Sequence, residues 1–234
     1  MNEQLDQDAF ARAAQTLGIE LNARQLAQLG EFHAQVHRSN RGMNLVSRRD
    51  IGRFAQRHLL DSLSGADLVR GERVLDVGTG PGLPGIPLAI ALPQVRMVLS
   101  DRSAKRQRFV QRVITELGLA NAEAWLVDIG REYPAVVQKF DTIVARAVLP
   151  VARLWDMVHP LLADDGQVLV FAGTRSACDG DTSDGSDTAS PSAEAMPLTE
   201  ALSQEVNSQV FTRNIPGLEA DHQLVRLWWR ESSR

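Results

Sequence analysis

The chain has 234 residues and a mass of 25.7 kDa, and 44% of its residues are hydrophobic, which suffices for the core of one α/β domain. Its single cysteine, Cys178, excludes an internal disulfide framework and fits a reducing cytoplasm. The first ten residues are polar and acidic and no apolar run has the length of a bilayer span, so we expect neither a signal peptide nor a membrane segment.

The net charge of −4 conceals two basic stretches. Residues 176–196 hold five acids and no Lys or Arg, so the rest of the chain carries a charge of +1. Residues 38–58 contain six arginines with Asp50 as the only acid, and residues 102–112 contain five basic residues and no acid. Such clusters indicate either a phosphate-binding surface or two solvated helix faces.

Residues 1–70 are predicted to form a helical extension, with helices at 6–17, 22–40 and 49–64. The second helix shows an apolar stripe at helical spacing. Asn22 is a suitable N-cap for that helix, and Asn40 to Gly42 a suitable end.

From residue 72 the pattern alternates between strand and helix, which predicts a parallel sheet covered on both faces and defines a domain of residues 71–234. The expected strands are 73–77, 95–100, 123–128, 140–145 and 166–171, and the helices 84–92, 104–118, 132–138 and 150–163. Two more strands, 204–212 and 222–230, would close a seven-stranded sheet as an antiparallel hairpin. The Ser- and Asp-rich segment 173–197 is predicted to be a disordered acidic insertion.

The stretch Val74–Pro87 predicts a nucleotide-binding turn, because the acid Asp76 ends a buried strand and the glycines Gly78, Gly80 and Gly82 follow it. We expect the first amides of the next helix to favour an anionic group of the ligand. The spacing also satisfies the dinucleotide fingerprint, so this turn alone leaves NAD and other nucleotide-like cofactors open.

Three polar residues follow later strands, where such sheets bind ligands. Asp101 lies 21 residues after Gly80, as expected of an acid that binds ribose hydroxyls, or it caps the next helix. Asp128 would contact an adenine edge or form an ordinary turn. Arg146 would bind a carboxylate or phosphate, or form a structural ion pair. The Pro-Pro-aromatic run of enzymes that methylate exocyclic amines is absent here, which points to a nucleophile with an exposed lone pair.

Other kinds of catalytic motif are not found. His58, taken alone, is expected to be structural. Five scattered histidines and one cysteine indicate no metal site, and neither a GxSxG elbow nor a P-loop lysine occurs.

Five stretches together resemble the RsmG (GidB) family, methyltransferases that modify N7 of a guanine in 16S ribosomal RNA. They are Asn44–Ser47, Arg57–Ser62, Asp76–Pro87, Asp101–Arg106 and Ala145–Ala147. The resemblance covers about residues 20–172 and resumes near His222. It implies a class I methyltransferase fold, Rossmann-like, with S-adenosylmethionine as donor and 16S RNA, within a small-subunit particle or precursor, as partner in the cytoplasm.

The family pattern and the strand-end positions together give the expected site. The cofactor-binding residues are Gly78, Gly80, Leu83, Asp101, Asp128, Ile129, Gly130 and Arg146. The RNA-binding candidates are Arg57, His58, Lys105 and Arg106. No catalytic residue and no metal ligand is assigned, because N7 of guanine is nucleophilic at neutral pH and needs no general base. Two departures from the family are Ala172, where a lysine is usual, and the acidic segment 176–196.

Three other functions remain open at this point. A small-molecule or protein methyltransferase would not need the arginine clusters. An NAD-dependent oxidoreductase would fit the glycine turn and Asp101, but not the helical extension or the antiparallel ending. A non-catalytic RNA-binding protein would not need an intact glycine turn.

Overall fold

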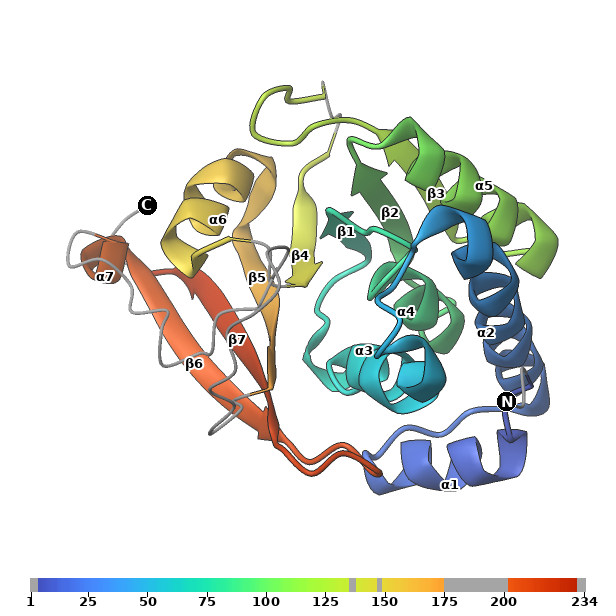
Figure 1. The fold of residues 1–234 in the computed structure, drawn as a ribbon. Helices are drawn as coiled ribbons and strands as arrows, with labels where there is room; N and C mark the ends of the chain where they lie inside the picture. Colours follow the sequence, from blue (N-terminus) through green and yellow to red (C-terminus); the bar gives the residue numbers. More distant parts are fainter. Residues whose placement is uncertain (1–3, 135–137, 147–148, 175–201, 231–234) are drawn as a thin grey trace, which may run out of the picture.

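The computed structural model describes residues 4–134, 138–146, 149–174 and 202–230, and a seven-stranded sheet forms the centre of this part of the chain (Figure 1). The strand order is β3-β2-β1-β4-β5-β7-β6. β1 to β5 pair in parallel, whereas β7 is antiparallel to both β5 and β6. The predicted antiparallel ending is therefore confirmed. The strands are β1 (Arg73–Val77), β2 (Arg96–Asp101), β3 (Ala122–Leu126), β4 (Phe140–Arg146), β5 (Leu162–Thr174), β6 (Val206–Arg213) and β7 (His222–Trp229).

The strand register aligns the carboxyl ends of the three central strands. Val77 of β1 pairs with Ser100 of β2 on one side and with Ala145 of β4 on the other. The residues one position further along, Gly78, Asp101 and Arg146, therefore lie along the same edge of the sheet. This edge is where an open parallel sheet binds its ligand.

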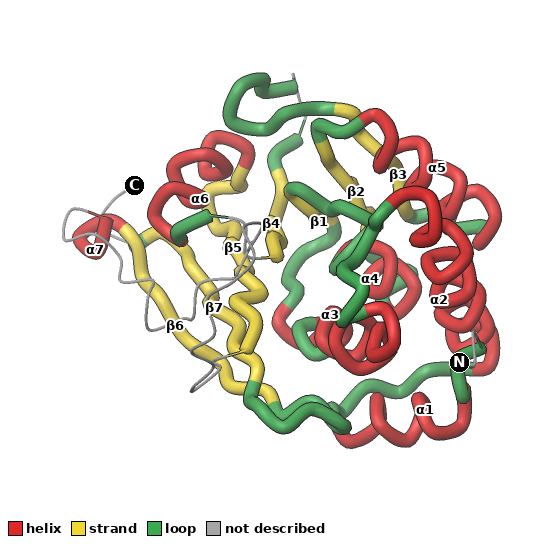
Figure 2. Tube along the Cα trace, viewed as in Figure 1, coloured by secondary structure: helices red, strands yellow, loops and turns green. Residues whose placement is uncertain are grey.

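Helices cover both faces of the sheet (Figure 2). Val74 and Leu75 are successive residues of β1 whose side chains enter two different apolar clusters, because side chains alternate along a strand. The cluster on one face includes residues of α1, α2, α4 and α5, and the cluster on the other face includes residues of α6. The helices are α1 (Gln7–Thr16), α2 (Ala23–Met43), α3 (Asp61–Leu63), α4 (Gly85–Ala91), α5 (Ala104–Leu117), α6 (Val151–Val158) and α7 (Leu202–Glu205).

Among the described residues, no helix combines the length and the apolar character that a membrane crossing requires.

The long helix α2 begins as predicted but extends further than predicted. At its start Asn22 and Gln25 form a capping box, in which each side chain accepts a hydrogen bond from the backbone N–H of the other residue. The predicted end at Asn40 to Gly42 is wrong. The helix continues to Met43 and ends at Asn44, which takes the left-handed conformation with φ of 50° and donates its N–H to Asn40 O.

The predicted helix at 49–64 is present as one helical run at 51–63, but its type changes along its length. It consists of a 3₁₀ turn at Ile51–Arg53, a π-helical turn at Ala55–Leu60 and the short α3. Single π turns within helices are rare and occur often at functional sites. Here the turn carries His58 towards the carboxyl end of β4, as described below.

Other predicted boundaries also differ from the structure, and the largest difference in a strand is β5, which spans Leu162–Thr174 where 166–171 was predicted. β3 ends at Leu126, two residues earlier than predicted, so Asp128 lies in a loop. Residues 132–134 of the predicted helix at 132–138 are not helical, and residues 135–137 lie outside the described residues. The predicted helix at 150–163 stops at Val158, and a 3₁₀ turn that contains Pro160 follows, because proline lacks the N–H that a continuing helix needs. β5 thus begins at Leu162. The predicted insertion at 173–197 lies outside the described residues except for its first two positions.

Candidate functional site

The turn between β1 and α4 is built on glycines for two separate reasons. Gly78, Gly80 and Gly82 have φ values of 70°, 57° and 97°, in the left-handed region that favours glycine. A Cβ atom at Gly78 would meet nothing within 4 Å, so this residue faces open space, whereas one at Gly82 would lie 2.6 Å from Ile86 Cγ1. A Cβ at Gly85 would lie 2.6 Å from Asp76 Oδ2. Gly78 leaves room for a ligand, and Gly82 and Gly85 allow close packing.

The expectation that the first amides of α4 favour an anionic group of the ligand is wrong, because Gly85 N–H and Ile86 N–H, like other amides of the turn, bind acceptors of the protein itself. Gly80 N–H donates to Asp101 Oδ2 at 3.0 Å, and Gly85 N–H donates to Asp76 Oδ2 at 2.8 Å. Leu83 N–H donates to Thr79 O at 2.8 Å. Two carboxylates and one backbone carbonyl of the protein itself accept these hydrogen bonds, so the turn is held by internal contacts.

Asp76 stabilises the turn through hydrogen bonds to its residues. Its Oδ2 also accepts the Thr79 hydroxyl at 2.5 Å, and its side chain is fully buried. Burial raises the pKa of Asp76 to about 7, although the hydrogen bonds from Thr79 and Gly85 oppose that change. Its Oδ1 has no hydrogen-bond partner among the described residues. Asp76 therefore lies at the boundary between its neutral and charged forms at physiological pH.

A pocket of about 310 Å³ opens at the carboxyl ends of β1 and β2, within the size range of small-ligand sites. Four of the predicted cofactor-binding residues line it, namely Gly78, Asp101, Asp128 and Ile129. The remaining lining residues are Val77, Ser100, Arg102, Arg106, Val127, Ala145, Leu149, Leu154 and Met157. The other four predicted cofactor-binding residues, Gly80, Leu83, Gly130 and Arg146, are not among the residues that line this pocket, and Leu83 is buried in the core.

Asp101 is positioned to bind a ligand while it also orders the protein around it. Its Oδ1 accepts the Ser103 N–H at 2.8 Å, and its Oδ2 accepts the Gly80 N–H. Each carboxylate oxygen has about two acceptor sites, so both oxygens retain one that a ribose hydroxyl would fill. The N-cap of α5 is Ser103, whose hydroxyl accepts from Arg106 N–H, so the alternative of Asp101 as the helix cap is wrong.

The loop after β3 forms the opposite wall of the pocket. Gly130 has φ of 97°, and a Cβ atom there would lie 2.5 Å from Met157 Cγ. Gly130 lines an adjoining hollow of about 470 Å³, which shares Asp128, Ile129 and Met157 with the pocket. The apolar wall formed by Leu149, Leu154 and Met157 was not predicted from the sequence, because the range of the helix does not show which of its residues border the pocket.

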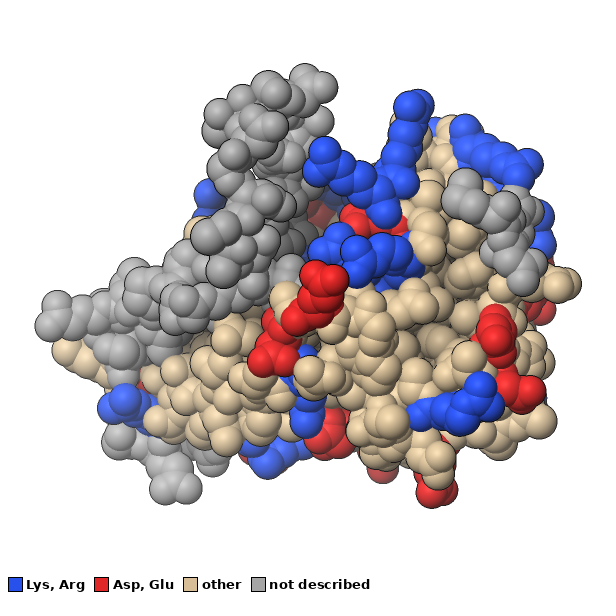
Figure 3. Space-filling view, turned by 60° about the horizontal axis from the view of Figure 1, so that its bottom comes forward, with Lys and Arg blue, Asp and Glu red and all other residues tan. Residues whose placement is uncertain are grey.

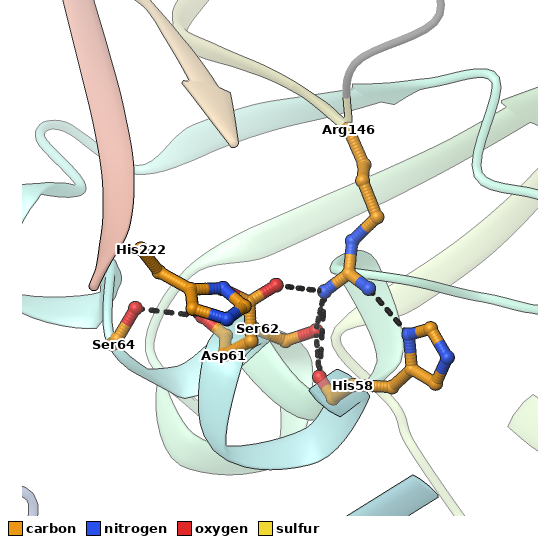
Figure 4. Close-up of polar contacts among 6 residues, drawn as sticks. All are labelled: His58, Asp61, Ser62, Ser64, Arg146 and His222. Atoms are coloured by element: carbon orange, nitrogen blue, oxygen red, sulfur yellow. Dashed lines mark hydrogen bonds and ion pairs between the residues drawn. The ribbon is translucent and has the colours of Figure 1, made fainter. Parts of the chain in front are cut away.

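Arg146, at the end of β4, lies in a cluster of polar side chains that comes from three distant parts of the chain (Figure 4). Its Nη2 donates to Asp61 Oδ2 at 2.6 Å and to Ser62 Oγ at 3.1 Å. Its Nη1 lies 2.6 Å from His58 Nδ1. The Asp61 Oδ1 atom lies 2.7 Å from His222 Nδ1. The ion pair that was the alternative for Arg146 is therefore present, and His58, expected to be structural, contacts the arginine directly.

The pKa values in this cluster follow from burial and from the arginine. Burial, and then the charge of Arg146, lower the pKa of His58 to about 3, so this imidazole is neutral at physiological pH. Burial alone would raise the pKa of Asp61, but the charge of Arg146 and the hydrogen bond from His222 outweigh burial and hold it below its ordinary value. The cluster thus contains a charged Arg–Asp pair beside a neutral His58.

The two basic stretches meet on one surface, and Figure 3 shows Lys and Arg side chains gathered together on that face. Lys105 of α5 donates to the Gly42 carbonyl near the end of α2 at 3.3 Å, and Arg112 Nη2 donates to Ser39 Oγ at 3.1 Å. The exposed members are Arg38, Arg41, Arg48, Arg49, Arg53, Arg102, Lys105, Arg106, Arg108 and Arg112. Two RNA-binding candidates have acidic partners, since Arg57 pairs with Asp50 at 2.7 Å and Arg106 lies 3.7 Å from Asp101.

A hollow of about 480 Å³ lies near the amino end of β2. The side-chain amides that line it already bind backbone carbonyls of the protein, because Gln25 donates to Ile90 O and Ala91 O, and Asn121 donates to Ala89 O. These amides satisfy the last carbonyls of α4 and hold α2 against it. We therefore assign this hollow a role in packing.

The residues of the pocket fit a nucleoside cofactor. The bare Gly78 leaves space, Asp101 offers acceptors for hydroxyl groups, and the wall of Leu149, Leu154 and Met157 suits an aromatic base. The part of the chain that the structure describes contains no group of three or more His, Cys, Asp or Glu side chains that would hold a metal ion. Ala172, at the position where the resemblance implies a lysine, is fully buried in the core on the α6 face.

Comparison with known proteins agrees with this geometry. The family described as GidB, rRNA small subunit methyltransferase G, matches residues 25–198. The protein of that name from Methylococcus capsulatus is 37% identical over 216 residues, which cover 92% of this chain and 95% of the relative. The one from Chromobacterium violaceum is 34% identical over 212 residues, which cover 90% and 92%.

Solved structures show the same fold at low sequence identity. The O-methyltransferase TomG from Streptomyces achromogenes, in complex with SAM, has a TM-score of 0.55 at 18% identity over 96% of this chain and 99% of that one. A SAM-dependent methyltransferase from Aquifex aeolicus has a TM-score of 0.52 at 13% identity over 75% and 92%. The predicted class I methyltransferase fold is confirmed. The chain belongs to the GidB family of ribosomal RNA small subunit methyltransferases.

Proposed function

We propose that the protein transfers a methyl group from S-adenosylmethionine to N7 of a guanine in 16S ribosomal RNA. The observation that carries this proposal is the pocket at the carboxyl ends of β1 and β2, with Gly78 and Asp101 at its edge, in a chain of the GidB family. We assign residues 71–234 to the methyltransferase domain and residues 1–70 to a helical extension of it.

Four residues of the pocket would hold the cofactor. Asp101 would accept hydrogen bonds from the ribose hydroxyls, and Gly78 would allow close approach of the backbone. Asp128 and Ile129 would contact the adenine, with the wall of α6 against its face. When bound, S-adenosylmethionine supplies an electrophilic methyl group. The chain itself contributes position, because the turn that carries Gly78 is already braced by Asp76 and Asp101.

The residues around the cleft suit an acceptor that needs no proton removed. N7 of guanine carries an exposed lone pair, so no general base is required. His58 is neutral, and its Nδ1 is occupied by Arg146, so it is not available as a base. The methylated guanine would be a cation, which an unpaired arginine nearby would repel. Asp61 neutralises Arg146, so the arginine would bind the cofactor carboxylate or an RNA phosphate without hindering that step.

The basic surface formed by the end of α2 and the start of α5 supports an RNA substrate. Lys105 and Arg106 are exposed beside the pocket, so phosphate contacts there would position the target guanine, and we propose the same role for Arg57. His58, predicted as a further RNA-binding residue, has Nδ1 bound to Arg146 and Nε2 buried, so it would act through Arg146 and not on a phosphate. The basic residues come from two segments that are distant in sequence and meet in the fold, which favours folded RNA within a small-subunit particle or precursor over a short free sequence. Such an enzyme would act in the cytoplasm, where ribosomal subunits assemble.

Methyl transfer tests the proposal directly. The protein would be incubated with S-adenosylmethionine labelled in its methyl group and with small-subunit particles that lack the modification. The RNA would then be digested to nucleosides and analysed by mass spectrometry. The proposal predicts labelled 7-methylguanosine from 16S RNA. Label only in another methylated nucleoside would contradict the N7 assignment, and label in protein or in no product would contradict RNA methylation itself.

A further inference from the structure

The carboxylate of Asp61 links two side chains that come from distant parts of the chain, Arg146 and His222 (Figure 4). One oxygen, Oδ2, binds Arg146 at 2.6 Å, and the other, Oδ1, lies 2.7 Å from His222 Nδ1. Asp61 belongs to α3, Arg146 ends β4 and His222 begins β7. One short carboxylate thus connects the helical extension, the strand at the mouth of the cleft and the closing hairpin.

Exposure differs sharply within this group. The side chains of Asp61 and His222 are 7% and 5% exposed, whereas that of Arg146 is 21% exposed. The arginine is therefore the most exposed of the three at the carboxyl edge of the sheet, and the acid and the histidine are more deeply buried. An interior carboxylate with one charged partner and one further donor is a supporting group, because solvent and substrate do not reach it.

Hydrogen-bond chemistry fixes which atoms carry protons. Arg146 Nη1 only donates, so His58 Nδ1 accepts and the proton of the neutral imidazole is on Nε2. The carboxylate of Asp61 accepts, so His222 carries a proton on Nδ1 and donates it to Oδ1. His58 thus accepts a hydrogen bond from Arg146, whereas His222 donates one to Asp61. Both outer nitrogens of the guanidinium have fixed partners, which defines its orientation.

We propose that Asp61 and His222 are positioning residues, which hold the Arg146 guanidinium in its working orientation at the carboxyl end of β4, next to Ala145 of the pocket. Asp61 also cancels the charge that would otherwise repel a methylated, cationic guanine. Their function is thus to make Arg146 a directional hydrogen-bond donor with little net charge. This inference rests on the proposed function, because it requires that Arg146 contact the cofactor or the RNA.

The competing interpretation is that the cluster only attaches the hairpin to the helical extension. The chain contains a second link of that kind, which serves as a matched control. Arg213 of β6 binds both oxygens of Asp67, at 2.8 and 2.7 Å, and joins the same two parts of the chain on an exposed surface. Asp67→Asn should weaken the attachment of the hairpin to the helical extension without changing the contacts of Arg146.

A double-mutant cycle distinguishes a positioning role from a structural one. Methyl transfer to small-subunit particles would be measured for the full-length wild-type chain, Asp61→Asn, Arg146→Gln and the double variant, below the melting temperature of each. Since Asp61 acts only through Arg146, we expect Asp61→Asn to lower kcat/KM for S-adenosylmethionine or for RNA by about tenfold, and to lower it no further when Arg146→Gln is present. The parameter that falls should be the same in both single variants.

His222 provides a second test in case Asp61→Asn does not fold. His222→Leu removes the donor and should lower the same parameter, whereas His222→Asn, whose amide N–H replaces Nδ1–H, should restore most of it. Three results would each overturn the inference. The first is an equal loss from Asp61→Asn with and without Arg146→Gln, and the second is no loss at all. The third is a loss in Asp67→Asn as large as that in His222→Leu. If the wild-type protein transfers no methyl group, the proposed function itself fails and this inference fails with it.

Discussion

Replacement of Asp101 by asparagine tests the cofactor site more sharply than any other single change. The substitution keeps the size and shape of the side chain but removes its charge and turns one acceptor into a donor. Asp101 Oδ1 and Oδ2 already accept the N–H groups of Ser103 and Gly80. An asparagine oxygen would satisfy one of them, so the amide would have no acceptor left for a second ribose hydroxyl.

The expected loss follows from the strength of such contacts. Hydrogen bonds to a charged group contribute about 1.5–3 kcal/mol each, so loss of one predicts a Kd for S-adenosylmethionine that is roughly 10- to 150-fold weaker. Isothermal titration of each purified protein measures this value. Thermal unfolding, followed by circular dichroism, shows whether the variant remains folded at the temperature of the titration.

Asp141 supplies the matched control for this experiment. Its Oδ2 also accepts two backbone N–H groups, from Glu72 at 2.8 Å and Arg73 at 2.9 Å, but at the amino end of β1, away from the pocket. Because one oxygen of Asp141 accepts both bonds, the amide oxygen of Asp141→Asn can keep them, so this variant removes a backbone-binding charge away from the pocket and should leave the Kd unchanged. An unchanged Kd in Asp101→Asn, or an equal loss of affinity in both variants, would refute the assignment of Asp101 to the ribose.

Three further predictions concern stability and RNA binding. Gly85→Ala would place a Cβ 2.6 Å from both Asp76 Oδ2 and Leu99 Cδ2, and should lower the free energy of unfolding in urea by about 1–3 kcal/mol, whereas Gly52→Ala, with open space around it, should not. Because the folded pKa of Asp76 is raised to about 7 from 3.8, its contribution to stability is lost as the pH rises through this window, by on the order of 4 kcal/mol. The pKa of His58 is lowered to about 3, so its contribution to the free energy of unfolding changes with pH in the opposite direction over part of that range. The test is therefore the free energy of unfolding of the wild type minus that of Asp76→Asn, which should fall steadily between pH 4 and 7. Arg108→Ala should reduce the salt dependence of RNA affinity by about one unit of slope in a filter-binding titration, and Arg24→Ala, at the hollow near the amino end of β2, should leave it unchanged.

The sequence was sufficient to predict the sheet and the strand-end positions of the site. Strand and helix alternate with short connections, so Gly78 and Asp101 had to lie at one edge, and the structure places both at the pocket. Leu83 was carried over from the family pattern alone, and it lies in the core of the structure. The hydrogen bonds of the turn were not foreseen, because whether an amide faces a ligand or a carboxylate depends on side-chain geometry that residue spacing does not determine.

The polar cluster around Arg146 could not be predicted from the sequence. Asp61 and His222 are separated by 161 residues and meet only because β7 inserts between β5 and β6. Each alone looked like an ordinary polar residue at the end of an element. The one available signal was their position in segments that resemble the family, and that signal indicated neither a contact nor a function. The extended α2 and the π-helical turn before α3 also depend on packing in three dimensions.

The most direct test of the central claim is a pair of isothermal titrations of the full-length protein, one with S-adenosylmethionine and one with NAD. The pocket, the antiparallel hairpin and the family membership predict binding of S-adenosylmethionine and none of NAD. Binding of NAD alone would contradict the account and favour an oxidoreductase built on the same glycine turn.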